Sequence, residues 1–383
     1  EQSGRESDRT SLLDLALLFL RLGTIAFGGP AAHIAMMEDE VVRRRRWMTQ
    51  QEFLDLLGAT NLIPGPNSTE MAIHIGHRRR GGPGLLVAGI SFIVPAALIV
   101  MGFGWAYVRY GSLPQIAGIL YGVKPVIIVI VLQALWSLGK TSIKTKLTAG
   151  VVAAAVILTF LGIHELLILL GAGILVGSWC LAREMGRDGP TSILSFTPLT
   201  VFFSGTATTT FGLWWLFLFF LKVGSVLYGS GYVLLAFIRA DLVERWHWLT
   251  ESQLLDAIAV GQVTPGPVFT TATFIGYVLA GPKGAVVATV GIFLPAFFFV
   301  AVSGPLVPRI RRSPTAGAFL DGVNAAALAL MGVVTYQLGR AALIDLPTLA
   351  LALLSAIILF RFRVNSAWLI IGGAVTGWFL YGR

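Results

Sequence analysis

The tripeptide Pro64-Gly65-Pro66 recurs as Pro265-Gly266-Pro267, at an offset of 201 residues (64 to 265). Each copy interrupts an apolar segment, residues 53–76 in one case and residues 254–277 in the other. The outer prolines remove backbone donors and the glycine permits a sharp turn, so a continuous helix through either copy would cost several kcal/mol. We therefore expect each segment to be a re-entrant hairpin of two short half-helices.

The repeated tripeptide belongs to an internal duplication of the chain. At the same offset Trp47 corresponds to Trp248, and after a shift of one residue Pro95 corresponds to Pro295. Chance does not hold a register over such a length, so the chain consists of two homologous halves. We expect a polar tail (1–10), a first membrane repeat (11–182), a linker (183–202) and a second membrane repeat (203–383).

The composition places both halves in a membrane. Of the 383 residues, 56% are hydrophobic and 12% are charged, whereas soluble domains carry about 25% charged residues. Uncharged stretches such as 85–108 and 284–308 exceed the roughly 18 apolar residues of a spanning helix. We expect an all-α polytopic membrane protein with no catalytic residues and no cofactor. The single cysteine, Cys180, excludes a disulfide framework.

The positive charges predict the topology. If the N-terminus is outside and both broken segments enter and leave on one face, each half has five spanning helices, of which residues 11–31 are the first, and the second half is inverted. Arg43 to Arg46 and Arg78 to Arg80 then share the inner face, which the positive-inside rule favours. We expect about ten transmembrane helices plus two re-entrant hairpins, with both termini periplasmic. The net charge of +9 arises from these loops and does not indicate nucleic-acid binding.

Inverted repeats with helices broken at matching positions are typical of secondary transporters. A half-helix that starts after a break exposes backbone amides and a partial positive charge, which attract an anion. Neutral donors accompany both breaks, and the amides Asn61 and Gln262 are equivalent in the two halves. The alternative is that the prolines only kink the helices and hydroxyl groups satisfy the freed carbonyls. Our candidate substrate-binding residues around the breaks are Asn61, Pro64, Gly65, Pro66, Asn67, Ser68, Thr69, Gln262, Pro265, Gly266, Pro267 and Thr270.

Three cations lie inside the apolar segments. Arg21 and Lys222 are equivalent, and each precedes a glycine turn, Gly28-Gly29 in the first half. We include these residues and Lys124 as candidate anion ligands, because a charge within the membrane is functional by default. The alternative for Arg21 and Lys222 is snorkelling toward an interface. Because the equivalent of Lys124 is Asn324, the predicted site is asymmetric.

Glu70 is the carboxylate closest to either break, and it is our candidate for proton coupling. A carboxylate suits an anion site only when it is protonated part of the time, which desolvation favours. The alternative is a salt bridge to Arg21 or another cation. Glu70, His74 and His77 have helical metal-ligand spacing, but the second half has no counterpart and His77 adjoins Arg78, so we expect no metal. We expect Asp55 and Asp256 to pair with loop arginines.

Phe27-Gly28-Gly29-Pro30, the two Pro-Gly-Pro breaks and the duplication together resemble the chromate transporter (CHR) family, long-chain two-domain type. The resemblance implies export of chromate across the bacterial inner membrane, driven by the proton motive force, with sulfate as a competing oxyanion. The implied partners are a small oxyanion and the lipid bilayer, with no nucleic acid, and a homodimer is left open. Two alternatives also remain open: a flippase or enzyme for a phosphorylated lipid, and an anion channel.

Overall fold

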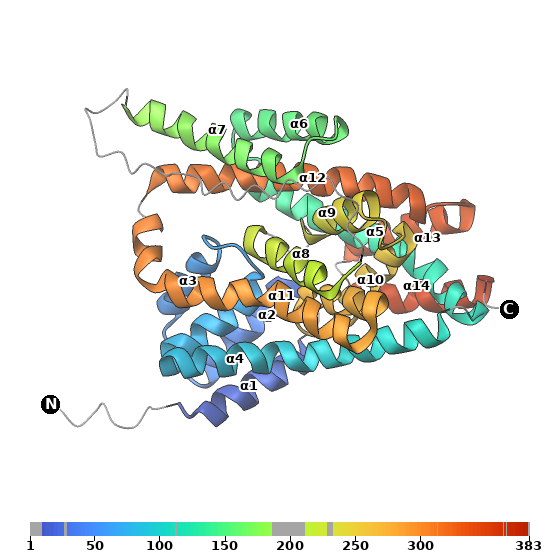
Figure 1. Cartoon of the computed structure of the whole chain (residues 1–383), viewed down its shortest axis with the longest axis horizontal. Coiled ribbons are helices and arrows are strands. Elements are labelled where there is room, and N and C mark those ends of the chain that lie inside the picture. Colours follow the sequence, from blue (N-terminus) through green and yellow to red (C-terminus); the bar gives the residue numbers. More distant parts are fainter. Residues whose placement is uncertain are drawn as a thin grey trace.

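The computed structural model describes residues 10–26, 29–111, 113–185, 211–227, 233–311, 313–362, 364 and 366–381. Within these ranges every regular element is helical, and most of the helices lie roughly side by side along the long axis of the molecule (Figure 1). The expectation of an all-α protein is confirmed.

The two halves have the same order of elements, except that the second half has an additional short turn, η4, before its long broken helix. The first half contains α1 (Leu12–Ile25), α2 (Gly29–Glu38), the π-helical turn η1 (Asp39–Arg44), α3 (Gln50–Thr60), α4 (Asn67–Tyr110), α5 (Pro114–Ser142), α6 (Lys146–Phe160) and α7 (Glu165–Met185). The second contains α8 (Leu213–Val226), α9 (Leu234–Ile238), η3 (Arg239–Arg245), α10 (Glu251–Val263), η4 (Val268–Thr270), α11 (Thr271–Arg311), α12 (Pro314–Ala342), α13 (Leu346–Phe362) and α14 (Ser366–Tyr381).

The long element α4 consists of two arms that fold back on each other. Its backbone leaves the helical region at Arg80 and Gly81, where Gly81 has a φ of 59°. The arms then meet at Gly76 and Gly84, where a side chain on either glycine would overlap the carbonyl oxygen of the other. The second half repeats this reversal within α11. Glycine is therefore needed both for the turn and for the close approach.

The helix α3 and the first arm of α4 form the re-entrant hairpin that the first Pro-Gly-Pro predicts. Arg78, at the end of the arm, is paired with Glu52 in the first turn of α3. Its neighbour Arg79 donates to Thr10 Oγ1 at 2.8 Å and to the carbonyl oxygen of Trp47 at 2.8 Å. The segments before α1, between η1 and α3, and after the first arm of α4 therefore share one face of the molecule.

Residues 11–31 do not form the single spanning helix that we expected. The helix α1 ends at Ile25, and α2 starts at Gly29, which has a φ of 77°. Arg21 of α1 lies 3.4 Å from Glu40 of η1, so α1 and the α2–η1 segment are the two arms of a further hairpin. The physical reason lies in the sequence Gly28-Gly29-Pro30, since glycine disfavours a helix interior and proline removes a helical hydrogen bond.

Contacts between α5 and α12 show that the halves are inverted. Tyr121, near the start of α5, donates to Asp345 just after α12 at 2.6 Å. Lys144, just after α5, is paired with Asp321 near the start of α12 at 2.8 Å. The start of each helix therefore meets the end of its equivalent, so the two equivalent helices run in opposite directions, as an inverted repeat requires.

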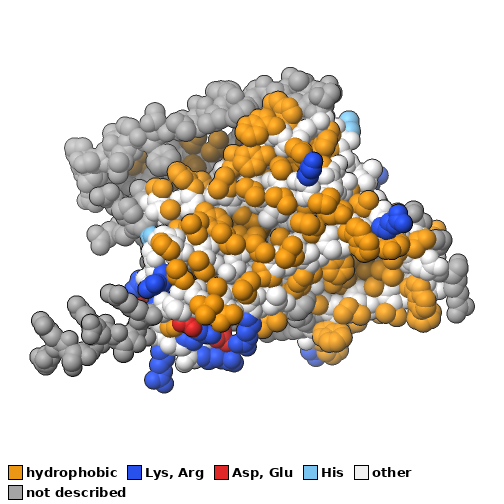
Figure 2. Space-filling view, turned by 60° about the horizontal axis from the view of Figure 1, so that its bottom comes forward, with side chains coloured by type: hydrophobic (Ala, Val, Ile, Leu, Met, Phe, Trp, Pro, Cys, Tyr) orange, Lys and Arg blue, Asp and Glu red, His pale blue; other side chains and the backbone are white. Residues whose placement is uncertain are grey.

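The surface is that of a membrane protein. Five of the described helices are long and apolar enough to cross a bilayer by length and composition. Figure 2 shows a broad apolar flank with basic and acidic side chains gathered at one end. We call the face that carries Arg43 to Arg46 and Arg78 to Arg80 the arginine-rich face.

The described chain begins and ends on different faces. Thr10 contacts Arg79 on the arginine-rich face. Tyr381 stacks on Tyr121, with ring centroids 4.8 Å apart, at the far end of the second arm of α4, which is about 40 Å long at 1.5 Å per residue. This arrangement differs from the expectation that both termini are periplasmic, because α1 turns back where we expected it to span.

Candidate functional site

The two Pro-Gly-Pro loops are hydrogen-bonded across the repeats. The amide of Gly65 donates to the carbonyl oxygen of Leu227, at the end of α8, at 2.8 Å. The amide of Gly266 donates to the carbonyl oxygen of Ala26, at the end of α1, at 2.9 Å. Ala26 and Leu227 are equivalent residues. Each Pro-Gly-Pro loop therefore contacts the break that follows the first helix of the other half, α8 or α1. Two kinds of helix break therefore meet in the middle of the molecule.

Close packing explains why each tripeptide centres on glycine. Gly65 and Gly266 have φ values of 141° and 87°, which side chains rarely adopt. A Cβ atom on Gly266 would lie 2.5 Å from Cβ of Ala96 and 3.0 Å from the carbonyl oxygen of Gly23. On Gly65 it would overlap the carboxylate of Glu70. The sequence requirement for glycine is therefore both conformational and steric.

The first turn of α4 supplies the polar groups that we predicted at the first break. No side chain caps this helix, and Ser68, Thr69 and Glu70 are buried. Across the break, Asn67 Nδ2 donates to Asn61 Oδ1 at 2.8 Å, so these two predicted residues lie together. The turn thus combines helix-terminal amides with small neutral donors, a combination that suits an oxyanion.

Glu70 is completely buried, and neither of its carboxylate oxygens has a hydrogen-bond partner among the described residues. The hydroxyl of Thr69 is also buried without a partner there. The alternative salt bridge to Arg21 is not formed, because Arg21 pairs with Glu40. Burying polar groups without partners is costly, so Glu70 and Thr69 form an unsatisfied polar cluster beside the first Pro-Gly-Pro loop.

The second break also has a positive φ at its glycine, but a short 3-10 turn, η4, follows it, and its side chains differ. Pro267 precedes η4 without a side-chain cap. The hydroxyl of Thr270 is buried and donates to the carbonyl oxygen of Pro267 at 2.8 Å. Gln262 is half-buried at the end of α10. No carboxylate corresponds to Glu70, since the equivalent residue is Thr271.

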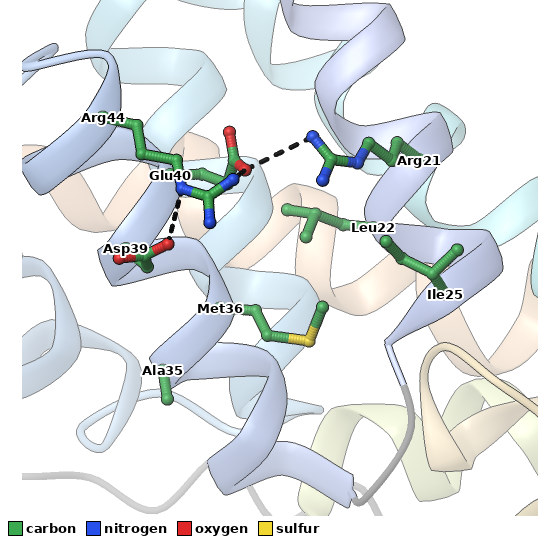
Figure 3. A pocket seen from close by; sticks show the side chains of 8 residues that line it. All are labelled: Arg21, Leu22, Ile25, Ala35, Met36, Asp39, Glu40 and Arg44. Carbon is green, nitrogen blue, oxygen red and sulfur yellow. Dashed lines mark hydrogen bonds and ion pairs between the residues drawn. The ribbon is translucent and has the colours of Figure 1, made fainter.

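Arg21 and Lys222 lie in separate ionic clusters. Figure 3 shows that Arg21 and Arg44 both point toward Glu40, with distances of 3.4 and 3.1 Å. The equivalent Lys222 is paired with Asp241. The structure does not bring Arg21 and Lys222 together. Gly29 begins α2 with open space around its Cα, and Gly28 lies outside the described residues.

Lys124 lies at the entrance of the second hairpin. Its ammonium group is 3.3 Å from Asp256 Oδ1 and 2.6 Å from Ser252 Oγ, and Tyr107 donates to Asp256 Oδ2 at 2.8 Å. Asp256 therefore pairs with a lysine of a spanning helix and not with the loop arginine that we expected. Its equivalent, Asp55, is exposed.

Sequence reasoning missed the acidic partners of Arg21 and Lys222. Glu40 and Asp241 are equivalent at the offset of 201 residues, which is the signal that could have identified them. Both lie in charged stretches outside the apolar runs, so hydropathy alone does not connect them with Arg21 and Lys222.

Broken half-helices in two inverted halves, with the breaks crossed in the middle, define the architecture of a membrane transport protein. The sequence profile of the chromate transporter family matches residues 13–177 and again residues 214–378. The chain therefore belongs to the chromate transporter family, and the double match agrees with the duplication.

Similar proteins support this assignment over nearly the whole chain. A chromate transport protein of Cupriavidus metallidurans is 35% identical over 95% of this chain and 92% of its own length. A probable chromate transport protein of Synechococcus elongatus is 31% identical over 91% of this chain and 89% of its own length. A chromate transport protein of Pseudomonas aeruginosa is 28% identical over 95% and 91%, respectively. No solved structure matches the chain.

Proposed function

We propose that this protein exports chromate from the bacterial cytoplasm across the inner membrane, with sulfate competing for the same site. The observation that carries the proposal is the crossed arrangement of the two breaks, in which uncapped half-helices meet in the middle of two inverted halves. The family and its relatives, named for chromate transport, support chromate as the transported oxyanion. The positive-inside rule makes the arginine-rich face cytoplasmic.

The anion binds at the first break. The backbone amides at the start of α4, the amides of Asn61 and Asn67, and the hydroxyls of Ser68 and Thr69 supply its hydrogen bonds. Neutral donors bind a dianion less tightly than paired arginines would, so the anion can be released. Arg21 and Lys222, each held by a carboxylate, are not part of this site.

The membrane potential drives export, and a proton on Glu70 permits binding. Moving one charge through 100 mV is worth about 2.3 kcal/mol, so a dianion leaving a negative interior gains about twice that amount. A deprotonated Glu70 would repel the dianion, whereas the protonated form adds a hydrogen-bond donor beside it. His74 and His77 follow Glu70 at helical spacing toward the arginine-rich face, and they supply the proton path.

Uptake of radiolabelled chromate into inverted membrane vesicles tests the proposal. Asn61→Ala and Ser68→Ala should reduce uptake at least tenfold with unchanged expression, and collapsing the membrane potential should abolish it. Sulfate should inhibit uptake competitively. Asn365→Ala, far from the break in the sequence, is the control. Normal uptake by both variants would remove the first break from the transport site.

The role of Glu70 has its own test. Wild-type uptake should fall as the pH rises, because the carboxylate loses the proton that admits the anion. Glu70→Gln keeps the shape of the protonated side chain, so uptake by this variant should not depend on the titration of residue 70. Dividing the wild-type rate by the variant rate at each pH removes the effect of the titration of chromate itself. A parallel decline in both proteins would exclude Glu70 as the coupling group and would also fit a channel.

A further inference from the structure

A pocket of about 290 Å³ lies between α1 and η1, outside the proposed transport site. One end is polar and is formed by Arg21, Glu40 and Arg44 (Figure 3). The other end is apolar, with Leu22, Ile25 and Met36 along its floor. We call it the α1–η1 pocket.

The arginines at the polar end share their carboxylate partners. Glu40 is shared by three guanidinium groups, those of Arg21 at 3.4 Å, Arg44 at 3.1 Å and Arg45 at 3.5 Å. Asp39 pairs with Arg44 at 2.8 Å, so with Arg45, which contacts Glu40 without lining the pocket, three arginines share two carboxylates. The side chains of Arg21 and Arg44 remain 54% and 60% exposed, so donors on both are free to bind an anion.

The second half shows what occupies the equivalent position. There Lys222, Asp241 and Arg245 replace Arg21, Glu40 and Arg44, with the same pairing. A further carboxylate, that of Glu165 at the start of α7, accepts from Arg245 at 3.0 and 3.2 Å. The corresponding residue for the first half is the uncharged Asn365. In the second half a carboxylate from the first half therefore completes the cluster, whereas the residue at the equivalent sequence position for the first half carries no charge.

The surroundings of the α1–η1 pocket select a lipid over a soluble anion. Along α1, Leu17 and Leu20 are 56% and 40% exposed, as expected of side chains in contact with acyl chains. The polar end includes Arg44, which belongs to the run Arg43 to Arg46 on the arginine-rich face. The apolar floor continues from there along α1 and α2. A phosphate joined to an acyl chain matches both ends, whereas a free oxyanion matches only one.

We propose that the α1–η1 pocket binds an anionic phospholipid, with its phosphate between Arg21 and Arg44 and an acyl chain along Leu22, Ile25 and Met36. Basic side chains near an anionic membrane surface contribute about 1 kcal/mol each, which is about fivefold in affinity. The lipid would take the place that the Glu165 carboxylate fills in the second half.

Native mass spectrometry of the purified full chain, titrated with phosphatidylglycerol in mixed micelles, tests the proposal. Arg44→Gln and Arg21→Gln should each weaken the tightest phosphatidylglycerol binding about fivefold. Arg43→Gln is the matched control, because Arg43 is an exposed arginine of the same segment that pairs with Glu38 outside the pocket. Ala35→Trp should weaken binding without removing a charge, since Ala35 lines the apolar end. Phosphatidylcholine should bind equally to all variants.

Two results would overturn the proposal. One is that Arg43→Gln and Arg44→Gln weaken phosphatidylglycerol binding equally, which would indicate a general electrostatic attraction to the protein surface. The other is that inorganic phosphate or sulfate displaces the lipid at millimolar concentration, which would make the pocket a soluble-anion site. If Arg21→Gln fails to fold, Ala35→Trp and Arg44→Gln still decide the matter.

Discussion

Lys124 Nζ lies 3.3 Å from Asp256 Oδ1, so α5 of the first half is tied to α10 of the second on the face opposite the arginine-rich face. The equivalent positions, Asn324 and Asp55, cannot form an ion pair. In addition, α10 packs against α5, α12 and α14, whereas α3 has substantial packing in the described chain only against α4. The second hairpin is therefore packed against more helices than the first.

We predict that Lys124→Asn, which makes the two halves alike at this position, opens the second hairpin. The substitution leaves buried Asp256 without its cation, which costs about 3 kcal/mol. In a Cys180→Ser background, Thr270→Cys should then react faster with a membrane-impermeant thiol reagent added from the face opposite the arginine-rich face. Lys144→Asn, which breaks the pair with Asp321 on the other face, is the control. Equal labelling rates with and without Lys124 would show that the ion pair with Asp256 does not hold the second hairpin closed.

Gly266→Ala should abolish transport and destabilise the fold. Its φ of 87° would cost an L-residue about 1–2 kcal/mol, and its Cβ would meet Ala96 at 2.5 Å. Displacing the loop also breaks the hydrogen bond to Ala26. Gly332→Ala is the matched control, since this helical glycine has open space around it and alanine favours helix by about 1 kcal/mol. Thermal unfolding in detergent should separate the two variants, and similar unfolding temperatures would contradict the steric argument.

The broken hairpins could be predicted from the sequence because Pro-Gly-Pro is incompatible with a continuous helix. The internal duplication then identified both copies. The break at Gly28-Gly29-Pro30 was visible too, but a glycine turn inside an apolar run does not reveal that the chain reverses. Because the chain reverses there and does not cross, the N-terminal end of the described chain lies on the other face from the one that we expected.

The contacts across the repeats could not be predicted. The bonds from Gly65 to Leu227 and from Gly266 to Ala26 use backbone atoms, so side-chain identity does not reveal the accepting residues. The pairing of Lys124 with Asp256 depends on how two distant helices pack, and local pattern gives no information about that packing. The candidate residues around the first break were predictable because they are contiguous with it.

Gly122→Ala should weaken the packing of α5 against α14. A Cβ on Gly122 would overlap the carbonyl oxygen of Gly373, and Cα of Gly377 would lie only 2.7 Å away. Small residues allow membrane helices this close an approach, and overpacking typically costs about 1–3 kcal/mol. Gly372→Ala changes the neighbouring glycine of α14, which has no atom within 4 Å of an added Cβ. Only Gly122→Ala should therefore unfold at lower denaturant concentration; a comparable loss in both would argue against the contact.

The inter-repeat bond from Tyr121 to Asp345 should make stability depend on pH in acid. The Tyr121 hydroxyl and then the backbone amide of Thr348 hold the pKa of the Asp345 carboxyl below its ordinary value of 3.8. A carboxyl whose pKa is lower in the folded state stabilises the fold above the unfolded-state pKa, and this contribution disappears as the pH falls through the folded-state pKa. The stability difference between wild type and Asp345→Asn should therefore be constant near neutral pH and shrink below about pH 4. Tyr121→Phe removes the larger cause of the lowered pKa, so in that background the difference should be smaller and should decline less with acid. Unfolding curves for the four proteins, recorded at matched pH values, measure this directly, and a difference that grows toward low pH would show that the sign is wrong.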